Sequence, residues 1–179
     1  MHLLHERVLC APGELSADGG VASADTTLHD EYGAPEYVWI RYAFNPAAED
    51  DALLVRCRLT LVNKTATRLP EATWVTFDTP SPSSRWQHNV LGSWQDPTNV
   101  ADGASKGLHY TSEDGVRRDD GCVHVRSIDT GLLRWGAPLP FPTPLHDDVD
   151  LSVGASFNLH NNIWNTNYPD WLPFDTLGR

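Results

Sequence analysis

Residues 157–171, FNLHNNIWNTNYPDW, hold the most unusual concentration of potentially functional side chains in this sequence. The segment contains five asparagines, with Trp164, Tyr168 and Trp171 placed among them. An asparagine side chain both donates and accepts hydrogen bonds, while Trp and Tyr offer flat apolar faces with a polar tip. Sugars have the complementary surface, because their C–H faces stack on rings and their hydroxyls bond to amides. This composition therefore predicts carbohydrate contact.

The candidate carbohydrate-binding residues are the amides and rings in the second part of this segment: Asn161, Asn162, Trp164, Asn165, Asn167, Tyr168 and Trp171. The same residue types also suit a structural role. Asparagine side chains hold irregular loops in place by bonding to backbone groups, and the rings could pack against the end of the domain. The sequence leaves both interpretations open.

Metal ligands and acid–base catalysts are the next possibility, because the chain has eight histidines. None of them is spaced like a metal cluster. The HDD stretch at 146–148 could ligate a cation, but its Pro-rich surroundings indicate an exposed loop. His88 and His109 could approach one another in space, which the sequence alone does not decide. We expect neither a metal nor a cofactor.

The carboxylates do not form a recognisable catalytic pair. Glu71 and Asp78 flank an expected strand, so they lie roughly 23 Å apart along it, whereas a glycosidase pair needs about 5 to 10 Å. The motifs GxSxG, GxGxxG and the P-loop are all absent. We predict no catalytic residue. If the chain were nevertheless a free-standing enzyme, its candidates would be His88, His109, Glu71 and Asp96.

Composition narrows the class of protein. The chain has 179 residues, of which 40% are hydrophobic and 21% charged, as in globular domains. Its net charge of −11 predicts no nucleic-acid partner, since such surfaces need clustered Lys and Arg. No apolar run is long enough to predict a membrane partner. The first ten residues lack the apolar core of a signal peptide, so the default compartment is the cytoplasm unless the chain is N-terminally truncated; the sequence assigns none.

Cysteine usage indicates no cross-linked scaffold. The three cysteines, Cys10, Cys57 and Cys122, are odd in number and form no CxxC pair, so neither a zinc ribbon nor a disulfide framework is indicated. Cys57 falls inside an apolar alternation. We therefore expect it to be a small buried residue.

The hydrophobic period is two rather than 3.6, which predicts strands. In residues 53–61 and 38–44 alternate positions are apolar, and 151–159 repeats the pattern with Leu159 facing inward and Asn158 outward. Shorter strands are expected at 72–77 and 122–128, and no segment has a helical stripe. Thirteen glycines and thirteen prolines separate these pieces. The predicted class is all-β, an antiparallel β-sandwich with few or no helices.

The expected organisation is one domain with a weakly patterned start. Residues 1–33 have little periodicity, and we expect an edge strand with loops or partial disorder there. Residues 34–179 form the predicted β-sandwich domain. The size of the chain suits a single core.

Three passages resemble a known family: RLPEATWVTF, LGSWQDPTNVADGASKGLHY and FNLHNNIWNTNYPDW. They are similar to the C-terminal part of the DUF5054 proteins, an uncharacterised family distantly related to the family 38 glycoside hydrolases, the α-mannosidase group. The similarity covers roughly residues 36–174. The matching positions are Arg68 to Ala72, Asp96, Pro97, Val100, Gly103, Leu108, His109, Phe157, Asn158, Leu159, Asn161, Asn162, Trp164, Thr166, Asn167, Pro169 and Trp171.

The resemblance implies a galactose-mutarotase-like β-sandwich that packs on a glycoside-hydrolase-like catalytic domain, in cis or in trans. The zinc ligands and nucleophile of the family 38 enzymes belong to an N-terminal domain that this sequence does not contain, so no catalytic residue is carried over. His160 replaces an aromatic residue of the family, and Asn165 replaces a glycine. The predicted function is an accessory β-sandwich that contacts carbohydrate or packs on a catalytic domain. The alternatives are a structural or interaction module without a ligand and a small free-standing carbohydrate-active enzyme.

Overall fold

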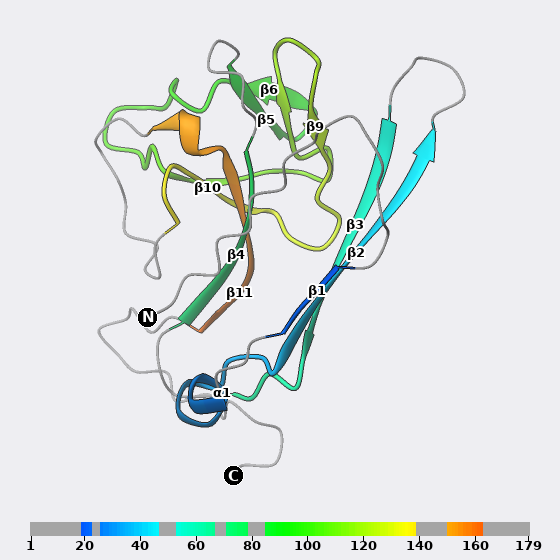
Figure 1. The fold of residues 1–179 in the computed structure, drawn as a ribbon. Helices are drawn as coiled ribbons and strands as arrows, with labels where there is room; N and C mark the ends of the chain where they lie inside the picture. Colours follow the sequence, from blue (N-terminus) through cyan, green and yellow to red (C-terminus); the bar gives the residue numbers. More distant parts are fainter. Residues whose placement is uncertain are drawn as a thin grey trace. The chain divides into compact units, whose positions relative to one another are not determined.

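The computed structural model describes residues 19–22, 26–46, 53–66, 71–78, 85–138 and 150–162 (Figure 1). Within these ranges the chain is mostly β, with antiparallel pairing throughout its sheets and one short α-helix. The predicted all-β, antiparallel class is confirmed. Two compact units divide the chain, a larger one around residues 70–167 and a smaller one around residues 11–69.

The smaller unit contains a three-stranded sheet in the order β1-β2-β3. Its strands are β1 (Gly19–Ala22), β2 (Tyr37–Pro46) and β3 (Leu53–Val62). The register places Phe44 opposite Val55 and Val38 opposite Leu61, so the apolar positions of both long strands share one face, as the period-two pattern predicts. Cys57 contradicts its prediction, because its side chain is exposed rather than buried.

The described part of the weakly patterned segment before residue 34, residues 19–22 and 26–33, contains one strand and one helix. β1 is an edge strand beside β2. The helix α1 (Thr26–Tyr32) has only seven residues and ends at Gly33, whose φ of 66° is left-handed and whose N–H donates to the His29 carbonyl at 3.0 Å. Two turns are too short to produce a helical stripe in the sequence.

The larger unit contains two four-stranded sheets, which we call the first and the second sheet. The first has the order β4-β11-β10-β7, and the second has the order β6-β5-β8-β9. Their strands are β4 (Glu71–Phe77), β5 (Trp86–Val90), β6 (Ser93–Gln95), β7 (Leu108–Tyr110), β8 (Val116–Arg118), β9 (His124–Val125), β10 (Leu132–Trp135) and β11 (Ala155–Asn162).

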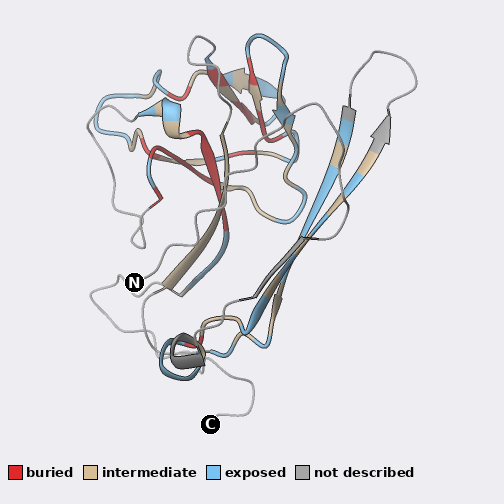
Figure 2. Cartoon of the chain, in the orientation of Figure 1, coloured by how far each residue is buried: buried red, intermediate tan, exposed pale blue. Residues whose placement is uncertain are grey.

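One core cluster contains residues from both sheets, which is consistent with a β-sandwich (Figure 2). Trp86 and Val116 come from the second sheet, and the others come from the first: Leu133, Trp135, Ala155 and Phe157. The rings of Trp86 and Trp135 lie 5.8 Å apart. Because alternate positions of each strand point to the same face, the short strands bring these apolar side chains together.

Two predicted strands need correction. The expected strand at 122–128 is reduced to the two residues of β9. Residues Leu151–Val153 form a 3₁₀ turn, because the Asp150 carboxylate accepts from the Ser152 N–H and Gly154 takes a φ of 93°. The strand expected from 151 therefore begins at Ala155, whereas the one expected at 72–77 is confirmed as β4.

A β-bulge changes the alternation of β11. Asn158 pairs with Trp74 and His160 with Thr73, so Leu159 is an extra residue. Leu159 is 36% exposed and Asn158 is 6% exposed, which is the reverse of the burial expected from strict alternation.

We predict that Phe157→Ala destabilises the larger unit by about 3–5 kcal/mol, because a buried ring leaves a cavity. Phe157 is 2% exposed and packs edge-to-face on Phe77 at 5.9 Å. Urea unfolding measures the change. Ile128→Ala is the control, since Ile128 is 80% exposed; equal losses in the two variants would contradict the assigned core.

The turn between β5 and β6 gives a second stability prediction. Leu91 has a φ of 51° and Gly92 a φ of 88°, and Leu91 is 91% exposed. Asparagine tolerates this left-handed backbone better than leucine, so Leu91→Asn should raise the free energy of unfolding by about 0.5–1 kcal/mol. Gly92→Ala should lower it. Urea midpoints that move in the opposite directions would exclude this turn geometry.

Candidate functional site

The C-terminal candidates lie mostly outside the described residues. Only Asn161 and Asn162 are within them. They lie at the end of β11, where it pairs with the start of β4. Asn161 is exposed and its side chain donates to the Asn158 side chain at 3.1 Å. That contact fits the structural interpretation of an asparagine. The candidates that lie outside the described residues, and whose role stays a prediction, are Trp164, Asn165, Asn167, Tyr168 and Trp171.

The structure brings His88 and His109 together. Their ring centroids lie 4.8 Å apart in an edge-to-face arrangement. The two residues come from β5 and β7, hence from different sheets. His88 is 4% exposed, and its ring lies 6.3 Å from that of Trp135. The two imidazoles are therefore part of the packing between the sheets.

Burial keeps both imidazoles neutral near pH 7. The pKa of His88 is lowered to about 4, mainly by burial and further by His109, while Asp96 acts in the opposite direction. Burial also lowers the pKa of His109, although its bond to the Lys106 carbonyl partly opposes this. That bond, at 2.9 Å, requires Nε2 of His109 to be the donor. Nδ1 of His88 is buried without a hydrogen-bond partner.

The catalytic candidates do not all converge. Asp96 is near enough to His88 to influence its pKa, but its carboxylate accepts from the Thr98 hydroxyl at 2.6 Å and the Thr98 N–H at 2.8 Å. Glu71 lies on β4, three strands from the β7 strand of His109, which is about 14 Å across the sheet. Among the described residues, no group of three His, Cys, Asp or Glu could hold a metal ion.

The outer face of the second sheet carries a different set of side chains, which we call the Trp94 cluster. The register pairs Gln87 with Arg117 and Arg117 with His124. Trp94 pairs with Asn89, two positions from Gln87. These four positions alternate with the inward-facing core positions, so they share the opposite face. The cluster consists of Gln87, Trp94, Arg117 and His124.

Contacts within the Trp94 cluster hold the indole in place. The Arg117 guanidinium carbon lies 4.1 Å from the Trp94 ring centroid, a cation–π distance, and Arg117 Nε donates to the Gln87 side-chain oxygen at 2.9 Å. The His124 ring meets the indole edge-to-face at 5.6 Å, and His124 Nε2 donates to the Asp114 carbonyl at 2.7 Å. A ligand at this surface meets an apolar ring, a cationic fork and an imidazole that are already oriented.

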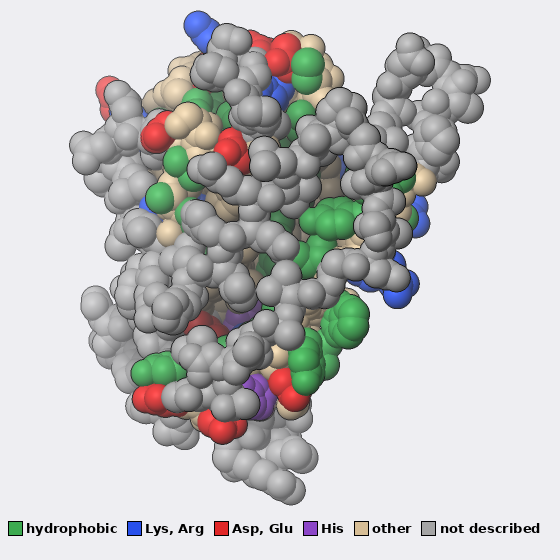
Figure 3. Space-filling model, viewed as in Figure 1, with side chains coloured by type: hydrophobic (Ala, Val, Ile, Leu, Met, Phe, Trp, Pro, Cys, Tyr) green, Lys and Arg blue, Asp and Glu red, His purple; other side chains and the backbone are tan. Residues whose placement is uncertain are grey.

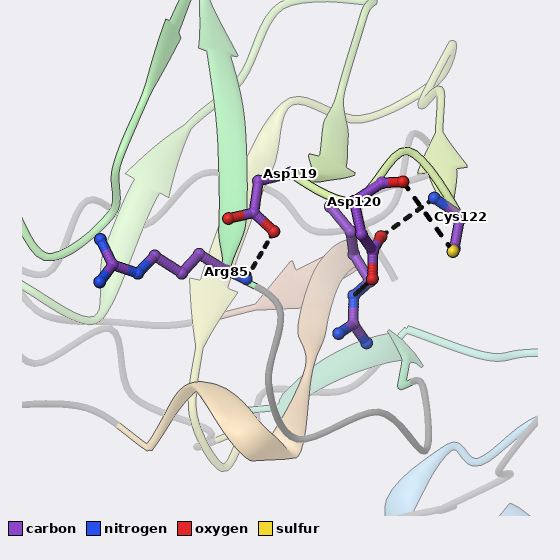
Figure 4. A network of polar contacts seen from close by, with 5 residues as sticks. Arg85, Asp119, Asp120 and Cys122 are labelled. Atoms are coloured by element: carbon purple, nitrogen blue, oxygen red, sulfur yellow. Dashed lines mark hydrogen bonds and ion pairs between the residues drawn. The ribbon is translucent and has the colours of Figure 1, made fainter.

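A second polar network organises the end of the same sheet (Figure 4). The Asp119 carboxylate accepts from the Arg85 backbone N–H at 2.9 Å, and the Asp120 carboxylate accepts from the Cys122 N–H at 3.0 Å. Asp120 also lies 3.6 Å from the buried Arg118 guanidinium. These bonds shape the turn between β8 and β9. They therefore have a structural explanation.

The sequence analysis considers His88 in this region but misses the Trp94 cluster. The available signal was the set of positions that alternate with the apolar ones in WQHNV and VRR. It was weak because β6 and β8 have three residues each, too few to establish a period.

Comparison with known proteins finds no match among family models, curated proteins or solved structures. The resemblance to the DUF5054 family stays a prediction. In the part of the chain that the structure describes, no helix is long and apolar enough to cross a membrane.

Acidification should destabilise the larger unit through His88. Its pKa is about 4 in the folded protein and about 6.5 in an unfolded chain, so the unfolded state binds more protons between these values. The free energy of unfolding should fall as the pH drops from about 6.5 to about 4, by up to roughly 3 kcal/mol from this residue. Urea unfolding from pH 8 to pH 4 measures this slope.

His88→Gln should remove much of the slope, because glutamine does not titrate. His160→Gln is the matched control, since the His160 side chain is 42% exposed and should leave most of the slope intact. An unchanged pH dependence in the His88 variant would show that the loss of stability has another source.

Proposed function

We propose that this chain is a non-catalytic accessory β-sandwich that contacts carbohydrate. The observation that carries the proposal is the Trp94 cluster, an indole held by Arg117 and His124 on the outer face of a sheet. Indoles stack on apolar ring faces, and guanidinium, imidazole and amide groups bond to hydroxyls. The finer fold that we propose is a galactose-mutarotase-like sandwich.

The same proposal gives the chain a partner. As the C-terminal part of a DUF5054-type, glycoside-hydrolase-like protein, the sandwich would hold substrate beside a catalytic domain in cis or in trans. Catalysis by this chain alone is disfavoured because His88 is buried, and the half-buried His109 uses its Nε2 in a bond to the Lys106 carbonyl. Glu71, a carboxylate candidate, lies on β4, at the opposite edge of the first sheet from the β7 strand of His109.

The proposed contact uses preorganised groups. Arg117 is bonded to Gln87 and lies over Trp94, so little side-chain freedom is lost when a ligand binds. The guanidinium retains N–H groups that can meet sugar hydroxyls, since only Nε donates to Gln87. The predicted ligand is therefore a neutral sugar ring with an apolar face and neighbouring hydroxyls.

Trp94→Ala should lower affinity for neutral glycans at least tenfold, because alanine removes the stacking surface while leaving the core intact. A glycan array of mannose- and galactose-containing oligosaccharides identifies the ligand, and calorimetric titration measures the loss. Trp94→Phe should retain much of the affinity.

Tyr110→Ala is the matched control, because Tyr110 is an aromatic residue of the same unit that is 65% exposed and belongs to the first sheet. Its affinity should stay within twofold of the parent protein. If the parent protein binds no neutral glycan, or if both variants lose binding equally, the chain is a structural or interaction module instead.

A further inference from the structure

One face of the β2–β3 pair combines three arginines with exposed aromatic rings. The register places Arg41 opposite Arg58, Ala43 opposite Arg56, Trp39 opposite Thr60 and Tyr37 opposite Val62. These positions alternate with the apolar row on the other face. We call this surface the arginine face; blue Lys or Arg and green hydrophobic side chains lie together along these strands in Figure 3. Its defining residues are Tyr37, Trp39, Arg41, Arg56 and Arg58.

The three arginines of this face are exposed and have no charged partner among the residues that the structure describes. Directly opposed residues such as Arg41 and Arg58 have Cβ atoms about 5 Å apart, and like charges at this position destabilise a sheet. None of the three forms an ion pair or a side-chain hydrogen bond with any described residue. Arg117 and Arg118, by contrast, have partners in the second sheet. Repulsion between opposed arginines is unexpected in this chain, because its 24 acidic residues outnumber its 13 basic ones.

Exposed rings continue the same row of side chains. Trp39 is 56% exposed and Tyr37 is 41% exposed. Because same-face positions repeat every second residue, Tyr37, Trp39 and Arg41 follow one another at intervals of about 7 Å. Arg56 extends the row on the neighbouring strand. The face is therefore a strip roughly 20 Å long, with rings at one end and cations at the other.

We propose that the arginine face binds an acidic polysaccharide, a chain of sugars that carry carboxylate groups. Each guanidinium fork matches a carboxylate, and the rings of Trp39 and Tyr37 offer stacking surfaces for the sugar rings that carry these carboxylates. The proposal goes beyond the neutral-glycan function of the Trp94 cluster and does not depend on it, because the residues belong to the other unit.

The observations favour this ligand over two other anions. Nucleic-acid affinity depends on many phosphate contacts that each release counterions, and three arginines supply few of them. An acidic peptide would satisfy the cations but has no sugar faces for two adjacent exposed rings. A polyuronate supplies both carboxylates and stacking faces.

The test uses polygalacturonate and its fully methyl-esterified form, which keeps the sugars and loses the charges. The full chain should bind the acid polymer in calorimetric titration or affinity electrophoresis, more weakly as salt rises, and should bind the ester at least tenfold more weakly. Arg56→Gln/Arg58→Gln should reduce affinity for the acid polymer about tenfold. Trp39→Ala should also reduce it, whereas Trp94→Ala should leave it unchanged.

Arg85→Gln/Arg126→Gln is the matched control, because it removes the same charge from two exposed positions of the larger unit. Its affinity for polygalacturonate should stay within twofold. Thermal unfolding checks that the Arg56/Arg58 variant folds, and relief of repulsion should leave its midpoint equal or higher.

Three outcomes would overturn the proposal. If the two double arginine variants lost equal affinity for polygalacturonate, the net charge of the protein rather than the arginine face would explain the binding. Binding of polyglutamate or single-stranded DNA as tight as that of polygalacturonate would make the face a peptide or nucleic-acid surface. If the protein did not bind polygalacturonate at low salt, the arginines would instead serve to prevent the exposed strands from pairing with other chains.

Discussion

The contact between Trp86 and Trp135 is the interaction on which the larger unit depends. Trp135 is fully buried on the first sheet, and its ring lies 5.8 Å from Trp86 on the second. The strands beneath these indoles have four and five residues, so each alone contributes little pairing energy. Large rings compensate, because each buries far more area than an aliphatic side chain. The sandwich is therefore held mainly by its aromatic core.

That core also decides what the polar residues can do. His88 contacts both His109 and Trp135, and burial removes its charge near neutral pH. An imidazole that helps to fill the space between two sheets is poorly placed for proton transfer to a substrate. The residues at the alternate positions of these short strands lie on the outer face of the sheet instead. Arg117 and Trp94 face outward and retain surface that a ligand can reach.

The sequence predicts the long strands well because alternation over seven to ten residues leaves little ambiguity, as in β2, β3 and β4. It predicts the short elements poorly. β9 has two residues and α1 has seven, and neither length establishes a period. The turn at 151–153 depends on an Asp150 side-chain bond, which alternation does not reveal. Cys57 shows that an apolar row need not be buried.

The candidate site was predicted in part. The approach of His88 to His109 was anticipated as a possibility, but it depends on pairing between distant segments that no local pattern encodes. The Trp94 cluster was missed for the same reason, since its residues come from four strands. Of the C-terminal candidates, the structure describes Asn161 and Asn162, and the contact of Asn161 with Asn158 is a local amide pair.

The extra residue in β11 changes which face the end of that strand presents. Before it, Phe157 shares a row with Val75; after it, His160 rather than Leu159 occupies the row of Thr73, and His160 Nδ1 lies 3.9 Å from the Glu71 carboxylate. If β11 paired with β4 in strict alternation, Leu159 would lie opposite Thr73 and each later residue of the strand would face the other side of the sheet. Deletion of Leu159 would therefore remove the bulge and leave His160 opposite Thr73, so Asn161 and Asn162 would keep the faces that they have now.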